Sequence, residues 1–103
     1  MVDYKQLAKD YPGLFEDVSR LIFLIDPIDI NGVVNSEEYE PEVAAILPML
    51  KDTTSEKDIF KLVCDVFIRF FGDSTANINN KEELYRGIAR GISNAWWVYK
   101  NKP

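Results

Sequence analysis

The chain contains no histidine and only one cysteine, which removes much of the chemistry on which small enzymes depend. Without histidine there is no catalytic triad, no imidazole acid or base, and hardly any zinc or iron site. The single cysteine, Cys64, lies among apolar neighbours and has no partner for a disulfide within the chain, so we expect a buried, reduced thiol. These absences favour a protein that is not an enzyme and that uses no metal or other cofactor.

Long apolar runs are also missing. The longest, residues 21–25 and 43–50, are far shorter than the roughly 20 residues that span a bilayer, and no secretory leader pattern opens the sequence. With 103 residues, of which 47% are hydrophobic, the chain suits one compact domain, residues 1–103. We therefore expect a soluble, cytoplasmic protein that makes no membrane contact.

Basic residues are absent from the thirty positions between Leu21 and Leu50. The acidic residues of that stretch are Asp26, Asp29, Glu37, Glu38, Glu40 and Glu42. The rest of the chain is nearly neutral, so the net charge of −5 arises in this one stretch. Such a local concentration of negative charge attracts a positively charged partner and repels nucleic acid and anionic membranes.

Apolar spacing in the first half predicts helices over residues 3–10 and 14–25, separated by Tyr11-Pro12-Gly13. Asp26-Pro27 ends the second helix, because a residue before proline avoids helical geometry. Residues 28–38, with the turn signal Asn31-Gly32, are typical of an irregular connector. The first half thus predicts two helices that lead into an acidic connector.

Pro41 suits the first turn of a further helix, which Pro48 limits. Residues 55–58 resemble a capping box, and a helix should run from there to Gly72. Its expected core positions are Ile59, Val63, Val66, Phe67 and Phe70, and Leu62, Cys64 and Phe71 widen its apolar surface. This width indicates contacts on several sides.

Asn80 with Glu83 should cap the last helix. Its expected apolar positions are Leu84, Ile88, Ile92, Ala95 and Tyr99. Gly87 and Gly91 leave room for a close neighbour. No segment alternates with the period of a strand, so we predict an all-α, single-domain bundle of four to five helices.

The connector also resembles part of an EF-hand calcium loop. Asp29, Asn31, Gly32 and Glu38 match positions three, five, six and twelve of that loop, but Pro27 stands where the first oxygen ligand belongs. Calcium binding therefore stays open as an alternative to an ordinary connector.

Two aromatic residues are candidates for partner contacts. Tyr39 lies within the acidic stretch, and Trp97 shares a helical stripe with Arg86, Arg90 and Ser93 and not with the apolar positions. The alternative is that Trp97 packs against the first helix of the same chain. Two arginines in a chain with an isoelectric point near 4.6 do not make a nucleic-acid footprint.

Three short segments of the chain resemble a family of small, mostly helical bacterial proteins of unknown function. They are Asp26-Pro27-Ile28, Glu38-Tyr39-Glu40-Pro41-Glu42-Val43 and Ile46-Leu47-Pro48. The resemblance covers about half of the chain, from Leu21 to Gly72, and departs from the family at Asp29, where glycine is more familiar. It implies a helical fold and brings no catalytic residue with it. In size, acidity and helical make-up the chain is also similar to bacterial immunity proteins that neutralise basic toxins, including those of contact-dependent growth inhibition.

We therefore interpret the sequence as a non-enzymatic protein-binding module, most concretely an immunity protein whose partner is a basic toxin domain such as a nuclease. The expected contact residues are Asp26, Asp29, Glu37, Glu38, Tyr39, Glu40, Glu42 and Trp97. A calcium-responsive helical protein and a structural or regulatory protein remain the alternatives.

Overall fold

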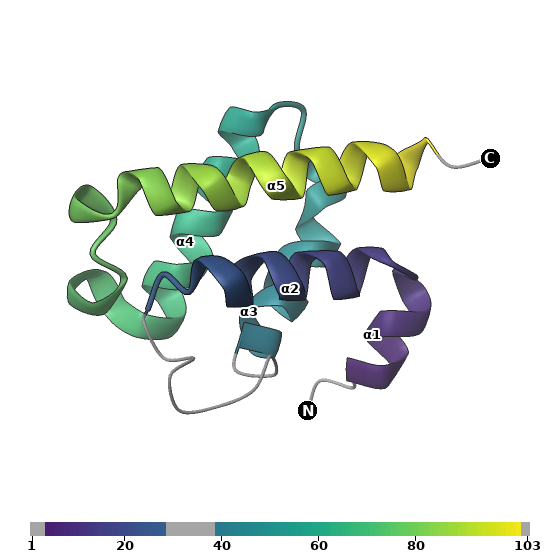
Figure 1. The fold of residues 1–103 in the computed structure, drawn as a ribbon, viewed down its shortest axis with the longest axis horizontal. Coiled ribbons are helices and arrows are strands. Elements are labelled where there is room, and N and C mark those ends of the chain that lie inside the picture. Colours follow the sequence, from purple (N-terminus) through teal and green to yellow (C-terminus); the bar gives the residue numbers. More distant parts are fainter. Residues whose placement is uncertain (1–3, 29–38, 102–103) are drawn as a thin grey trace.

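The computed structural model describes residues 4–28 and 39–101, and over these residues the protein is a bundle of five α-helices with two short 3-10 helices and no strand (Figure 1). The elements are α1 (Tyr4–Asp10), α2 (Leu14–Ile25), α3 (Glu40–Ile46), η2 (Leu47–Asp52), α4 (Glu56–Ala76), η3 (Ile78–Asn80) and α5 (Glu82–Lys100). The predicted all-α class is confirmed. Within the described ranges, no helix combines the length and the apolar character needed to cross a bilayer.

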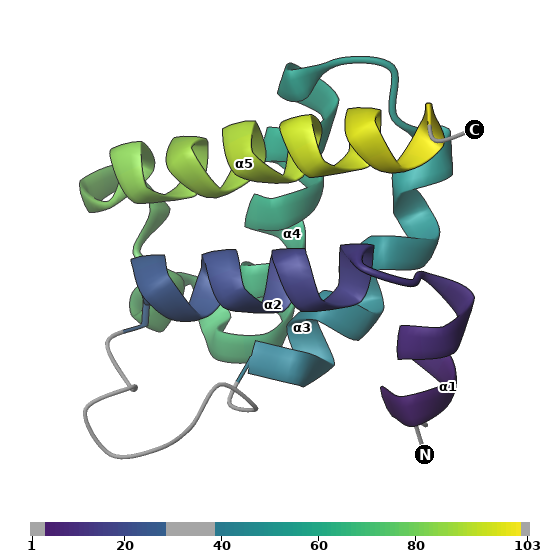
Figure 2. The same ribbon diagram turned by 45° about the vertical axis from the view of Figure 1, so that its right-hand side comes forward.

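Helices α2 and α5 lie side by side and run in opposite directions (Figures 1 and 2). Their close approach depends on Gly91, because a Cβ atom there would lie 2.4 Å from Cδ2 of Leu21. At Gly87 the same atom would lie 3.7 Å from Ile25, which is an ordinary contact. The predicted room for a neighbouring helix is therefore confirmed at Gly91.

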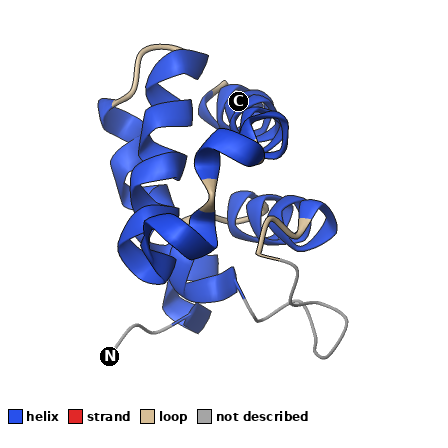
Figure 3. Ribbon diagram, turned by 90° about the vertical axis from the view of Figure 1, so that its left-hand side faces the viewer, coloured by secondary structure: helices blue, strands red, loops and turns tan. Residues whose placement is uncertain are grey.

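The chain from α3 to α4 passes across this antiparallel pair, which Figure 3 shows nearly end-on. An aromatic cluster lies where the layers meet, centred on Phe67 of α4. The Phe67 ring centroid lies 6.0 Å from that of Tyr39, 5.7 Å from Phe71 and 5.5 Å from Tyr85. Phe71 lies one turn further along α4, whereas the contacts with Tyr39 and Tyr85 join the start of α3 to α5 through Phe67.

Most helix boundaries follow the sequence. Asp26 ends α2 in the left-handed conformation, with φ of 51°, and its N–H donates to the carbonyl of Ile22 at 2.8 Å. Asp26 thus leaves right-handed helical geometry, as expected before Pro27, but it takes the left-handed conformation and not the extended one that proline favours. Pro48 ends α3 as expected, and the backbone tightens into η2 from Leu47 onward.

The capping box at the start of α4 is only half formed. The Ser55 hydroxyl accepts a hydrogen bond from the Asp58 N–H at 3.2 Å, as predicted. The Asp58 carboxylate, however, accepts from the backbone N–H and the hydroxyl of Thr54 at 2.9 and 2.8 Å. These two bonds lower the pKa of Asp58.

Two predicted boundaries need correction. The backbone breaks at Gly72, with φ of 83°, but the chain then makes one more turn to Ala76. The last helix begins at Glu82, and no side chain caps it. Asn80, the expected cap, instead donates to Asn77 Oδ1 at 2.8 Å, because the chain turns through η3 at this point.

Two expected core residues are exposed. Phe70 precedes the break at Gly72, and Leu84 lies in the first turn of α5. Tyr85, which is not among the expected apolar positions of the last helix, is fully buried and donates its hydroxyl to the carbonyl of Ala76 at 2.7 Å. Helical periodicity therefore gives the correct register in the middle of a helix and loses accuracy near its ends.

Candidate functional site

The two ends of the acidic connector are held together by one hydroxyl group. Tyr39 donates to Oδ1 of Asp26 at 2.6 Å and accepts from the N–H of Ile28 at 3.2 Å. We call this arrangement of Asp26, Ile28 and Tyr39 the clasp. Beside it, Lys81 donates from Nζ to the carbonyl of Pro27 at 2.6 Å, which ties the end of α2 to the start of α5.

Tyr39 reaches the clasp from inside the protein. Its side chain is fully buried and its ring packs against Phe67. Burial, followed by the hydrogen bond to Asp26, raises the pKa of Tyr39 well above its usual range, so the hydroxyl stays a neutral donor. The prediction that Tyr39 offers a side chain to a partner is therefore wrong, because the core already occupies it.

The acidic residues divide into two groups. Asp26 and Glu40 are half-buried, and Glu42 is only 3% exposed in the first turn of α3. The expectation that Glu42 belongs to an exposed patch is also wrong, since this turn packs into the protein. The other predicted contacts, Asp29, Glu37 and Glu38, lie outside the described residues.

The calcium alternative falls on the same part of the chain. Asp29, Asn31, Gly32 and Glu38 all lie outside the described residues. Residues 4–28 and 39–101 contain no group of three or more acidic, cysteine or histidine side chains that could hold a metal ion.

Trp97 lies on the exposed face of α5, as its polar stripe predicts. Its side chain is 63% exposed, and the Lys100 ammonium lies 5.6 Å from its ring centroid. The clasp lies near Lys81, sixteen residues earlier, which corresponds to about 24 Å along a helix. The structure therefore places Trp97 at the opposite end of α5 from the clasp.

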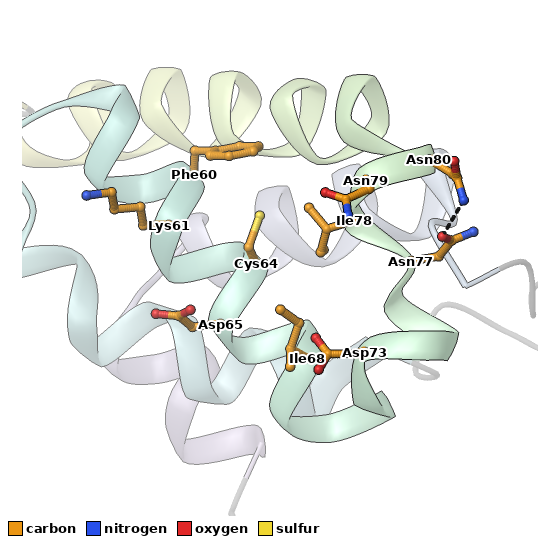
Figure 4. A pocket seen from close by; sticks show the side chains of 10 residues that line it. All are labelled: Phe60, Lys61, Cys64, Asp65, Ile68, Asp73, Asn77, Ile78, Asn79 and Asn80. Atoms are coloured by element: carbon orange, nitrogen blue, oxygen red, sulfur yellow. Dashed lines mark hydrogen bonds between the residues drawn. The ribbon is translucent and has the colours of Figure 1, made fainter.

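A cavity that the sequence analysis did not predict lies between α4 and η3 (Figure 4). Its volume is 590 Å³, within the range of ligand sites. Phe60, Cys64 and Ile68 of α4 and Ile78 of η3 form its apolar floor. Its polar rim consists of Lys61, Asp65, Asp73, Asn77, Asn79 and Asn80. The signal in the sequence was the four-residue spacing of positions 60, 64 and 68.

Cys64 brings a thiol, a potential nucleophile, to the lining of this cavity, but its surroundings make the thiol unreactive. The residue is 8% exposed. Burial, with a smaller contribution from the charge of Asp65, raises the pKa of the thiol to about 11. At neutral pH the thiolate is a minor species, so the group is a poor nucleophile. The predicted buried thiol is confirmed.

Comparison with protein-family profiles, with curated proteins and with solved structures finds no significant match to this chain.

Proposed function

We propose that the protein is a non-enzymatic binding module whose acidic connector recognises a basic protein partner. The most concrete form of this proposal is an immunity protein that neutralises a cationic toxin domain, such as a nuclease of contact-dependent growth inhibition, in the cytoplasm. The observation that carries it is the clasp. Asp26, Ile28 and Tyr39 fix both ends of the segment in which the negative charge of the chain is concentrated.

Holding the two ends of the connector in place should favour binding of a partner. Binding loses free energy when loops must be ordered at the interface, and this cost is smaller when the ends of the loop are already held. The carboxylates of the connector would face the lysines and arginines with which a nuclease holds phosphate. Such complementarity raises the association rate and selects against partners of the wrong charge.

The clasp also explains why a buried tyrosine occurs inside the acidic stretch. Tyr39 packs against Phe67 and reaches Asp26 with its hydroxyl, so it connects the connector to the core. In this proposal Tyr39 supports the contact surface from behind, and the acidic residues around it make the contact.

The test uses a candidate toxin domain encoded beside the gene for this protein. We would replace Glu37, Glu38 and Glu40 with glutamine, which removes three charges and leaves the buried Glu42 intact. We expect slower association, by about fivefold or more at low salt, and a weaker dependence of the rate on salt. Cells that express the toxin should lose protection.

The matched control replaces Asp10 and Asp52 with asparagine and Glu83 with glutamine. Each of these residues is exposed, so the control removes the same three charges from other parts of the surface. The control should bind as the unmodified protein does. Equal association rates for the two variants would mean that the connector only keeps the protein soluble.

A further inference from the structure

The cavity of Figure 4 has a neighbour of 350 Å³ between α4 and α5, and Phe60 and Lys61 line both cavities. Together they form a groove along α4, which we call the α4 groove. Its floor is Phe60, Cys64, Ile68 and Ile78, and Ala89 of α5 lies on its far wall. The clasp residues do not line either cavity.

The dimensions of the α4 groove suit a helix. From Lys57 to Ile68 the lining residues cover eleven helical steps, or about 16 Å, which equals about three turns. The floor residues of α4 recur every four positions, at 60, 64 and 68. An amphipathic helix repeats its apolar side chains at the same spacing, so it can match the floor along its whole length.

Charge is distributed unevenly along the α4 groove. Lys57, Lys61 and Arg86 line the end nearest the start of α4, where Glu56 is the one acidic lining residue. Arg86 is held in place by Glu82, whose carboxylate lies 2.9 Å from its Nε, and its guanidinium lies 4.7 Å from the Phe60 ring centroid.

The other end of the groove is lined by Asp65 and Asp73. A helix carries partial positive charge at its N-terminus and partial negative charge at its C-terminus. The two ends of the groove therefore favour a bound helix that runs antiparallel to α4.

We propose that the α4 groove binds an amphipathic helix of a protein partner, antiparallel to α4. Its apolar face packs on Phe60, Cys64, Ile68 and Ile78. Acidic side chains near its C-terminus face Lys57 and Lys61, and basic side chains near its N-terminus face Asp65 and Asp73. This site does not depend on the acidic connector, so a failed test of either proposal leaves the other standing.

The probe is a synthetic helical peptide of about 14 residues with leucine at every third or fourth position. Lysines occupy its N-terminal half and glutamates its C-terminal half, and a hydrocarbon staple on the outer face fixes the helix. A twin peptide with lysine and glutamate exchanged is the control. Fluorescence anisotropy with the full chain at low salt should give about tenfold tighter binding for the first peptide.

Two variants test whether the peptide occupies the α4 groove. Ile68→Glu places a charge on the floor and should weaken binding about tenfold or more. The double variant Lys57→Glu, Lys61→Glu makes both ends of the groove acidic and should therefore abolish the preference between the two peptides. Both lysines are exposed, so this variant keeps the fold even where Ile68→Glu does not. Leu24→Glu, at an exposed position of α2, should change nothing.

Three results would overturn the proposal. The first is equal binding of the two peptides, and the second is a preference that survives the double lysine variant. The third is a second copy of the chain in the groove, which sedimentation would show as a dimer that Ile68→Glu dissociates.

Discussion

Replacing Tyr39 with phenylalanine isolates the clasp, because it removes one oxygen atom and leaves the ring against Phe67. That oxygen makes two hydrogen bonds, one to a carboxylate and one from a backbone N–H. A bond to a charged group contributes about 1.5–3 kcal/mol and a neutral one about 0.5–1.5 kcal/mol. Asp26 and Ile28 are only part-buried at these bonds, so water can replace part of the lost hydrogen-bond energy. We therefore expect the free energy of unfolding to fall by about 2 kcal/mol.

A domain of this size has a free energy of unfolding of about 5–15 kcal/mol, so the change is readily measured. Urea unfolding followed by circular dichroism at 222 nm should show a lower midpoint with an unchanged slope. The melting temperature should fall by about 8 °C or more. Asp26→Asn, which keeps an acceptor oxygen, should lose about half as much.

Tyr85→Phe is the control for removing a tyrosine hydroxyl elsewhere, since its bond to the Ala76 carbonyl is buried and neutral. It should destabilise the fold by about 1 kcal/mol and leave partner binding unchanged. Tyr39→Phe should in addition slow the association of a basic partner. A loss below about 0.5 kcal/mol for Tyr39→Phe would refute the clasp as a structural device.

Four further outcomes are expected. Gly91→Val should destabilise the fold by about 1–3 kcal/mol in urea unfolding, because even a Cβ atom would lie 2.4 Å from Leu21; an unchanged midpoint would mean that α2 and α5 separate easily. Gly72→Ala should lose about 1–3 kcal/mol although the space beside Gly72 is open, since its φ of 83° with ψ of 159° is a conformation that essentially only glycine adopts; a stabilised variant would show that this turn can become helical. Cys64 should react slowly with Ellman's reagent at pH 8 and faster as pH rises toward its pKa of about 11, whereas denaturant should make the reaction immediate; an immediate reaction in native buffer would contradict its burial. Burial raises the pKa of Tyr85 from about 10 in the unfolded chain to about 12 in the folded protein. The unfolded chain therefore loses this proton at lower pH than the folded protein, so the free energy of unfolding should fall as pH rises from about 10 to 12. Tyr85→Phe should make that decline less steep.

Local signals in the sequence predicted most of the fold. Proline and glycine positions gave the ends of α2 and α3, because their effect acts through adjacent residues. The start of α5 was missed because Asn80 could cap a helix or bond within a turn, and only the η3 turn decides between them. Leu84 and Phe70 were misplaced because burial near a helix end depends on which neighbour covers it.

The candidate sites were less predictable. Both bonds of the clasp join residues more than ten positions apart, and nothing in the local pattern distinguishes Tyr39 as a core residue from Tyr39 as a surface contact. To predict the α4 groove one must know that no helix within residues 4–28 and 39–101 covers positions 60, 64 and 68, which depends on how all the helices are arranged. The polar stripe indicated an exposed Trp97 but left packing on the first helix open, and the structure decides in favour of exposure.

The clasp should also allow the length and sequence of the connector to change without loss of the fold. Its hydrogen bonds join Asp26, Ile28 and Tyr39, so the positions at which the chain leaves and re-enters the bundle are set by residues at the two ends of the connector. Doubling the length of a loop with fixed ends costs only about 0.6 kcal/mol. Insertions and new sequences between Ile28 and Tyr39 should therefore be tolerated by the bundle. If the proposed function holds, specificity for different partners could change there without any change in the fold.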